Sequence, residues 1–250
     1  MATFAASILV LSEDGGHRVM RALAGQLLRW LDPHHAPAAI DLEPDDEGAQ
    51  EAVQANLWKG KNSGGHRRLV EIARTVATKI MSPTGYVFIH IDADRLWSER
   101  HKNPSENVQR YLEDICLHVE RHVDALLAKQ QRPGDKLAVL SRLCLLAPYS
   151  SIESWLLQNT VVARSLCRKH HRGSDLDKFD AWERDRGLLD EVPRPKKATC
   201  LGAHRNYELA STRFPARAVY QAGKSFTESA KRLQACIPLV EALAATHPGS

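Results

Sequence analysis

Residues 86–91 constrain the fold more than any other part of the chain. They read Tyr-Val-Phe-Ile-His-Ile, an almost wholly apolar run rich in aromatic and β-branched residues. Such a run is typical of an inner strand of a parallel sheet whose two faces are both covered by helices. Strong turn residues at 82–85 precede it, and an Asp-x-Asp triplet follows it. The segment therefore predicts an α/β fold.

Strand-like and helical segments alternate around this run. Residues 5–11 form an apolar run that predicts a first strand, and 136–146 predict a further strand or apolar segment. Apolar residues recur at helical spacing in four segments, 17–31, 66–81, 104–130 and 152–170. This order predicts a mostly parallel sheet flanked by crossover helices.

Two other regions have a different character. Residues 33–65 are rich in Pro, Gly, Asp and Asn, and they predict an irregular surface insertion with a short strand near 38–42. From residue 175 onward the pattern is helical with loops, and no clear strand is present. We therefore expect one α/β domain over residues 1–170 and a helical C-terminal extension over residues 171–250.

The composition argues against a membrane protein and against a disulfide-rich secreted one. The apolar runs are far shorter than the roughly 20 residues of a membrane-spanning helix, and residues 1–11 lack the pattern of a secretory signal. The five cysteines are widely separated and form no Cys-x-x-Cys pair, which indicates buried free thiols. We expect a cytoplasmic protein, and the net charge of +4 is compatible with a polyanionic partner.

Acidic residues follow the predicted strands, where α/β proteins place their functional crevice. Glu13 follows the first strand, Asp92 and Asp94 follow the strand at 86–91, and Glu153 follows the apolar segment that ends at Pro148. In extended backbone the carboxylates of Asp92 and Asp94 point to the same side and are close enough to share one cation. Carboxylate oxygens favour Mg²⁺ or Mn²⁺.

Each acidic residue also has an interpretation that involves no ligand. Asp92 could cap a turn while Asp94 pairs with a neighbouring arginine. Glu13 could stabilise the N-terminus of the following helix, and Glu153 could cap the helix that it begins. His90, inside the apolar strand, is expected to be a buried residue with satisfied hydrogen bonds.

Positively charged side chains gather in two places that could contact phosphates. The first set, among glycines of the insertion and the start of the next helix, is Lys59, Lys61, Arg67 and Arg68. The second set, in the C-terminal part, is Lys196 and Lys197, close to Arg194. The alternative for both sets is ordinary solvated charge.

The order of the acidic sites resembles the TOPRIM-like fold, a metal-binding α/β unit of topoisomerases, primases, OLD-family nucleases and small bacterial defence proteins. In that family a Glu follows the first strand, as at residues 8–13, and Asp-x-Asp follows a later strand, as at residues 88–94. The sequence Ile-Glu-Ser-Trp-Leu-Leu at 152–157 looks like a stretch of RloB-like abortive-infection proteins. The resemblance covers roughly residues 5–170, with 33–65 as an insertion.

This resemblance implies phosphodiester chemistry that depends on Mg²⁺ or Mn²⁺. Glu13, Asp92 and Asp94 would hold the metal, which would polarise a phosphate and activate a water molecule. Glu13 could instead act as general acid or base, and Glu153 would be a further ligand or would anchor one. The expected function is a nuclease acting on DNA or RNA, by analogy in anti-phage defence.

Two other functions remain open at this point. One is a catalytically inactive TOPRIM-like module that binds nucleic acid, a partner ATPase or another defence-system subunit. The other is a phosphotransfer response domain with Asp92 as acceptor, although the chain lacks the downstream Thr/Ser and Lys strands that such a domain needs. None of these functions involves a membrane.

Overall fold

The computed structural model describes residues 4–13, 16–44, 59 and 63–247. Its sheet consists of β1 (Ala6–Ser12), β2 (Ile40–Glu43), β3 (Gly85–His90) and β4 (Leu143–Leu146), in the order β2-β1-β3-β4. Every pairing is parallel. The predicted α/β class is confirmed, and the sheet of the described residues is parallel throughout.

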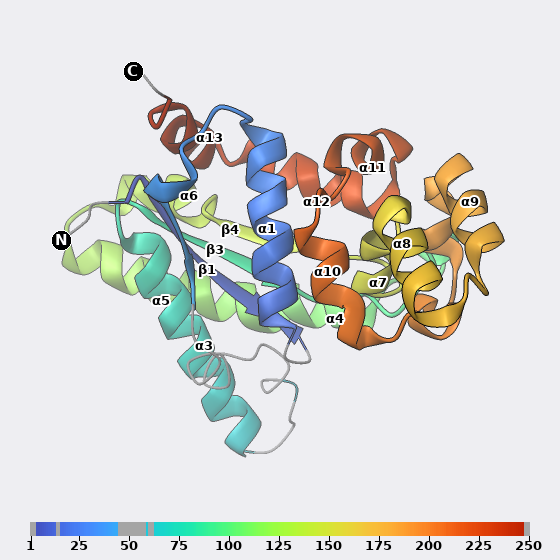
Figure 1. The fold of residues 1–250 in the computed structure, drawn as a ribbon. Coiled ribbons are helices and arrows are strands. Elements are labelled where there is room, and N and C mark those ends of the chain that lie inside the picture. The colour runs from blue at the N-terminus through green and yellow to red at the C-terminus, as the bar shows by residue number, and fades with distance from the viewer. Residues whose placement is uncertain (1–3, 14–15, 45–58, 60–62, 248–250) are drawn as a thin grey trace.

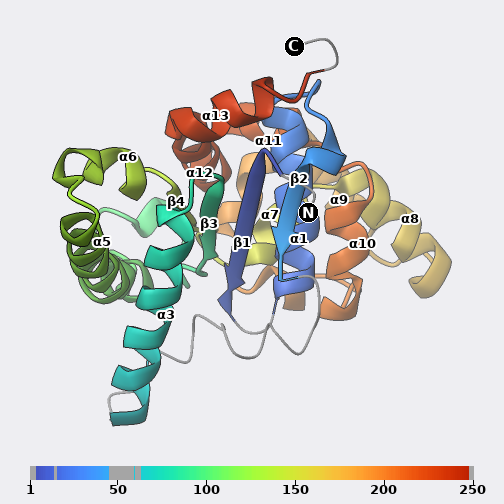
Figure 2. The same cartoon turned by 90° about the vertical axis from the view of Figure 1, so that its left-hand side faces the viewer.

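Side chains that alternate along the strands enter two separate cores. Ile8, Val10 and Phe88 face α1 (His17–Leu31) and the C-terminal helices. Leu11 and Ile89, on the opposite face, pack with α3 (Ser63–Met81) and α5 (Leu117–Lys129). Figure 2 shows α3 and α5 on one side of the strands and α1 on the other. Because both faces are covered, β1 and β3 are apolar along nearly their whole length.

Residues 171–247 of the predicted C-terminal extension are helical with short turns and loops, and these helices pack on the α1 side of the sheet (Figure 1). Their apolar residues, such as Leu209, Phe226 and Leu239, belong to the same core as Val10 and Phe88. The C-terminal helices are α8 (Thr160–His171), α9 (Leu176–Arg184), α10 (Asn206–Ser211), α11 (Ala216–Ala222), α12 (Lys224–Ala235) and α13 (Ile237–Ala244).

Three predicted segments are subdivided in the structure. Residues 104–130 form α4 (Glu106–Arg110), a π-helical turn (Tyr111–Cys116) and α5. Residues 136–146 form α6 (Lys136–Leu140) and then β4. Residues 152–170 form α7 (Ile152–Leu156) and α8, with a break where the Asn159 amide donates to the carbonyls of Leu209 and Thr212 at 2.9 and 2.8 Å. Short 3₁₀ turns lie at Pro37–Ala39, Trp97–Glu99, Pro133–Asp135, Arg186–Glu191, Pro195–Lys197 and Ala203–Arg205.

The segment predicted as an insertion contributes the edge strand β2, which pairs with β1 from Ala6↔Ile40 to Leu9↔Glu43. Residues 45–58 and 60–62 of that segment lie outside the described residues. Within the described part of the chain, no helix is both long enough and apolar enough to cross a membrane.

Gly85, at the start of β3, allows a close backbone approach. A Cβ atom there would lie 1.8 Å from the carbonyl oxygen of Lys79 at the end of α3. We expect Gly85→Ala to lower the free energy of unfolding by about 1–3 kcal/mol, measured by urea denaturation. Gly25→Ala is the control, because Gly25 lies inside α1 with Leu42 Cδ1 at an ordinary 3.8 Å. That variant should gain about 0.5–1 kcal/mol, and equal effects at both positions would contradict the steric argument.

Candidate functional site

The site begins where two neighbouring strands end together. Ser12, the last residue of β1, pairs with His90, the last residue of β3. Glu13 follows Ser12, its side chain is almost fully buried, and its Oε2 accepts a hydrogen bond from the Asp92 backbone N–H at 3.0 Å. The structure therefore brings Glu13 and Asp92 together, as expected for adjacent parallel strands.

Hydrogen bonds from two elements fix the Asp92 carboxylate. Its Oδ1 accepts from the backbone N–H of Ile152, the first residue of α7, at 2.8 Å. His90 Nε2 lies 3.0 Å from the same oxygen, and His90 Nδ1 lies 2.9 Å from Ser12 Oγ. Asp92 does cap a helix, but the helix is α7 beyond β4 and not the turn that follows Asp92. The buried His90 links Ser12 to Asp92, in addition to its place in the core.

Asp94 is exposed and is held by the start of α4. Its backbone φ is 53°, in the left-handed region. Asn107 Nδ2 donates to Asp94 Oδ2 at 2.8 Å and to the Asp92 carbonyl oxygen at 2.9 Å. Ser105, the N-cap of α4, donates to the Ala93 carbonyl oxygen at 2.6 Å. The Asp-x-Asp loop is therefore fixed by α4, and the Arg95 guanidinium donates to the Asp94 carbonyl oxygen at 3.3 Å.

A cavity of about 490 Å³ opens beside this loop. It brings together predicted residues that are far apart in the sequence. Asp94 and Glu153 line it together with the cations Arg194, Lys196 and Lys197. The 3₁₀ turn Pro195–Lys197 presents the two lysines, and both are exposed. Carboxylates and cations therefore share one concave surface, which suits a ligand that carries phosphate together with a metal ion.

Glu153 lies in the first turn of α7 and is held from two directions. Ser151 Oγ donates to Glu153 Oε2 at 2.7 Å. Asn206 Nδ2, at the start of α10, donates to Glu153 Oε1 at 2.9 Å. The side chain is thus oriented by hydrogen bonds that cross from α7 to the C-terminal helices.

The first predicted basic set is not gathered in one loop. Lys59 forms an ion pair with Glu13, and its carbonyl oxygen accepts from Arg110 at 3.0 Å. Arg67 and Arg68 lie on α3, whose N-terminal turns project away from the sheet (Figures 1 and 2). Arg68 pairs with Glu71 at 2.9 Å. Lys61 lies outside the described residues.

Sequence reasoning missed the residues that orient the acidic side chains. Asn107, Ser105 and Asn206 carry no motif, and only their positions at the starts of helices distinguish them. Ser12, the last residue of β1, carries no motif either. These partners come from elements that are distant in sequence, so only the folded chain reveals them.

The donor set fits a hard divalent cation in part. The Glu13 carboxylate accepts from the Asp92 backbone N–H, so two carboxylate-bearing residues adjoin here. Mg²⁺ is commonly bound through one or two carboxylates plus water and substrate phosphate. Among the described residues, however, no three His, Cys, Asp or Glu side chains are already arranged to hold a metal ion. The Lys59 ammonium also contacts Glu13. The residues suit a metal that binds together with its substrate better than one held in a permanent protein cage.

Fold and site together define an α/β protein with a parallel four-stranded sheet and, past the carboxyl ends of its strands, a crevice lined by acidic and basic side chains. Comparison with family models, with curated proteins and with solved structures gives no match for this chain.

Proposed function

We propose that the protein is a nuclease of TOPRIM-like type that hydrolyses phosphodiester bonds of DNA or RNA with Mg²⁺ or Mn²⁺. One observation carries the proposal. Glu13 and Asp92 meet at the ends of adjacent parallel strands, beside a cavity that joins Asp94 and Glu153 to Lys196 and Lys197. Asp94, two residues from Asp92, and Glu153 therefore border one hollow with basic groups that suit a polyanion, and metal-assisted phosphodiester cleavage needs both kinds of group.

The residues of the site have three different roles. Lys196, Lys197 and Arg194 bind and orient the phosphates at the cavity wall. Glu13 and Asp92, with Asp94, would hold the metal, which when bound supplies charge neutralisation at the phosphate and a more acidic water. Positioning residues keep these groups in place, because His90 and Ile152 fix Asp92 and Asn107 fixes Asp94.

A cleavage assay tests the proposal directly. Purified protein is incubated with plasmid, single-stranded DNA and RNA in Mg²⁺, Mn²⁺ or a chelator. We expect at least one substrate to be cut with either metal and none to be cut in chelator. Cleavage that persists in chelator, or no cleavage of any of the three in either metal, would contradict it.

A second candidate is a TOPRIM-like module that binds nucleic acid or a partner ATPase without cutting. The contact of the Lys59 ammonium with Glu13 favours it, because that contact neutralises a carboxylate that the metal would need. Binding to nucleic acid that is unchanged by metal, with no cleavage, would support this candidate. The anti-phage role, the cytoplasmic location and a partner ATPase or other defence-system subunit rest on the resemblance alone.

Lys196→Ala should weaken binding of nucleic acid of any sequence. Because one phosphate contact is lost, the slope of the logarithm of the association constant against the logarithm of salt concentration should fall by roughly 1. Fluorescence anisotropy with a labelled oligonucleotide, in chelator to prevent cleavage, measures both quantities.

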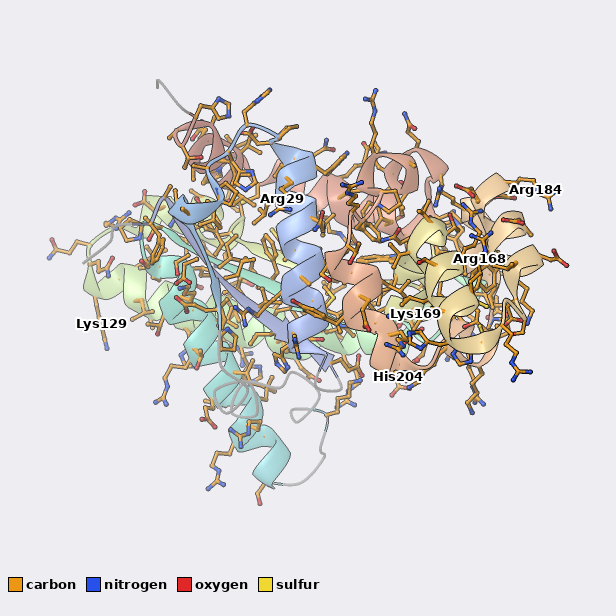
Figure 3. All side chains as sticks on the ribbon, in the orientation of Figure 1. Arg29, Lys129, Arg168, Lys169, Arg184 and His204 are labelled. Atoms are coloured by element: carbon orange, nitrogen blue, oxygen red, sulfur yellow. The ribbon has the colours of Figure 1, made fainter. Side chains whose placement is uncertain are left out.

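Lys129→Ala is the matched control for this variant. Lys129 is exposed at the far end of α5, remote from α8 and α9 (Figure 3). It lies roughly 30 Å further along the helix that begins near Asn107. We expect no change in the salt dependence for this control, and equal losses for both variants would indicate general attraction to a basic protein.

A further inference from the structure

Two thiols that are distant in the sequence lie close together, near the segment that carries Lys196 and Lys197. Cys200 Sγ–H donates to Cys167 Sγ at 3.0 Å, across 33 positions of sequence. Cys167 is fully buried on α8, whereas Cys200 is partly exposed. A disulfide joins its sulfurs at about 2.05 Å, so the formation of one here needs a further approach of only about 1 Å.

Cys200 lies in the segment that builds one wall of the cavity. Lys196 and Lys197 precede it, and Asn206, which holds Glu153, follows it. Cys200 is a free thiol, and hydrogen bonds hold this stretch, since the Cys200 backbone N–H donates to Asp175 Oδ2 at 2.5 Å. Lys178, on α9, donates to the Ala198 carbonyl oxygen at 2.8 Å. A covalent link at Cys200 would fasten the wall to α8.

We propose that Cys167 and Cys200 are a modification site, a dithiol that a low-molecular-weight disulfide oxidises to an intramolecular disulfide. The formation of the bond does not depend on what the cavity binds. The consequence for the cavity, that its basic wall is held more rigidly, rests on the function proposed above.

The exchange balances without any other oxidant. The Cys200 thiolate attacks one sulfur of oxidised glutathione, which forms a mixed disulfide and releases one glutathione thiolate. The Cys167 thiolate then attacks Cys200 Sγ and releases the second glutathione. The two protons lost by the cysteines pass to the two released thiolates. The net change is one dithiol and one glutathione disulfide to one protein disulfide and two glutathione thiols.

The rate of this exchange should rise steeply with pH. Burial, with the neighbouring Cys167 thiol and Asp175, raises the pKa of Cys200 to about 12, against a lowering contribution from Ser174. Lys178, which pairs with Asp175 at 2.9 Å, is the nearby cation. Because the thiolate is the attacking species, its fraction grows about tenfold per pH unit below the pKa. The initial rate at pH 8.5 should therefore be about tenfold that at pH 7.5, and a plateau between these values would contradict the assignment.

The test is peptide mapping of the full-length protein after incubation with oxidised glutathione at pH 8.5, followed by alkylation of the remaining thiols. We expect one linked peptide pair, Cys167 with Cys200, which reductant abolishes. Cys200→Ser should lose the link while its thermal unfolding stays cooperative. Cys116→Ser is the matched control, because Cys116 lies on the π-helical turn and has no part in the pair.

Other results would overturn the proposal. Alkylation of both Cys167 and Cys200 after prolonged oxidation would show that the sulfurs do not join. A disulfide between Cys144 and Cys236 in place of the expected one would show that another cysteine pair is the one oxidised. These two residues are buried together in the core on the α1 side of the sheet.

Hydrogen exchange tests whether the disulfide makes the basic wall more rigid, and it does so independently of the proposed function. Backbone amides of 194–205 should exchange more slowly in the oxidised protein than in the reduced one. Cys200→Ser should show no difference under the same treatment. Unchanged exchange despite a formed disulfide would refute the rigid wall. The absence of nuclease activity would affect neither the peptide mapping nor the hydrogen-exchange result.

Discussion

Asp92→Asn should reduce metal-dependent cleavage by at least about 100-fold while the fold is retained. Asparagine keeps an oxygen that accepts the N–H of Ile152, so α7 stays capped. The substitution removes the negative charge that a divalent cation needs. Cleavage rates under single-turnover conditions, with thermal unfolding measured in parallel, check both parts of the expectation.

Two further variants sharpen this result. Asp92→Ala removes the cap as well as the charge, so it should also lose about 1 kcal/mol of stability. Asp177→Asn is the control for charge alone, because Asp177 is an exposed aspartate on α9. Full activity in Asp92→Asn would exclude Asp92 as a ligand and would reduce it to a helix cap.

Trp155→Ala should destabilise the protein by about 3–5 kcal/mol. The Trp155 side chain is fully buried, and its ring lies 5.3 Å from that of Phe226 on α12. Its Nε1–H donates to Ser225 Oγ at 2.7 Å, and Ser225 Oγ donates to Asp190 at 2.8 Å. The variant therefore leaves a large cavity between α7 and the C-terminal helices. Urea denaturation measures the loss.

Trp155→Phe separates the ring from the hydrogen bond. Phenylalanine keeps a six-membered aromatic ring beside Phe226 but removes the Nε1 donor together with the rest of the five-membered ring. We expect a loss between about 1 kcal/mol, the usual net value of one hydrogen bond, and the loss of Trp155→Ala. If both variants lost the same amount, the hydrogen bond would be the main contribution and the packing argument would be wrong.

The parts of the fold that depend on local pattern were predictable. The helix His17–Leu31 and the strand Gly85–His90 follow from spacing and from β-branched content within the segment itself. The proximity of Glu13 and Asp92 was predictable as well, because the carboxyl ends of neighbouring parallel strands lie at one edge of the sheet.

The remainder depends on contacts between distant segments. The break between α7 and α8 involves Asn159, whose partners are carbonyls more than 49 positions away. The hydrogen bond from Ile152 to Asp92 arises only once β4 has paired beside β3. The cavity joins Glu153 to Lys196 through folding of the C-terminal helices. No local pattern carries that information. The contact between Cys167 and Cys200, 33 positions apart, likewise depends on the folded chain.

The π-helical turn Tyr111–Cys116 lies between α4 and α5 in one continuous helix. On its N-terminal side Asn107 holds the Asp-x-Asp loop, and on its C-terminal side Val119 and Val123 enter the core. A π turn accommodates one residue more than an α-helical turn. If the same residues formed a regular α-helix, the extra residue would rotate the two sides by roughly 100° relative to each other. With the valines seated, Asn107 would then face away from Asp94, so the length of this helix is part of the geometry of the site.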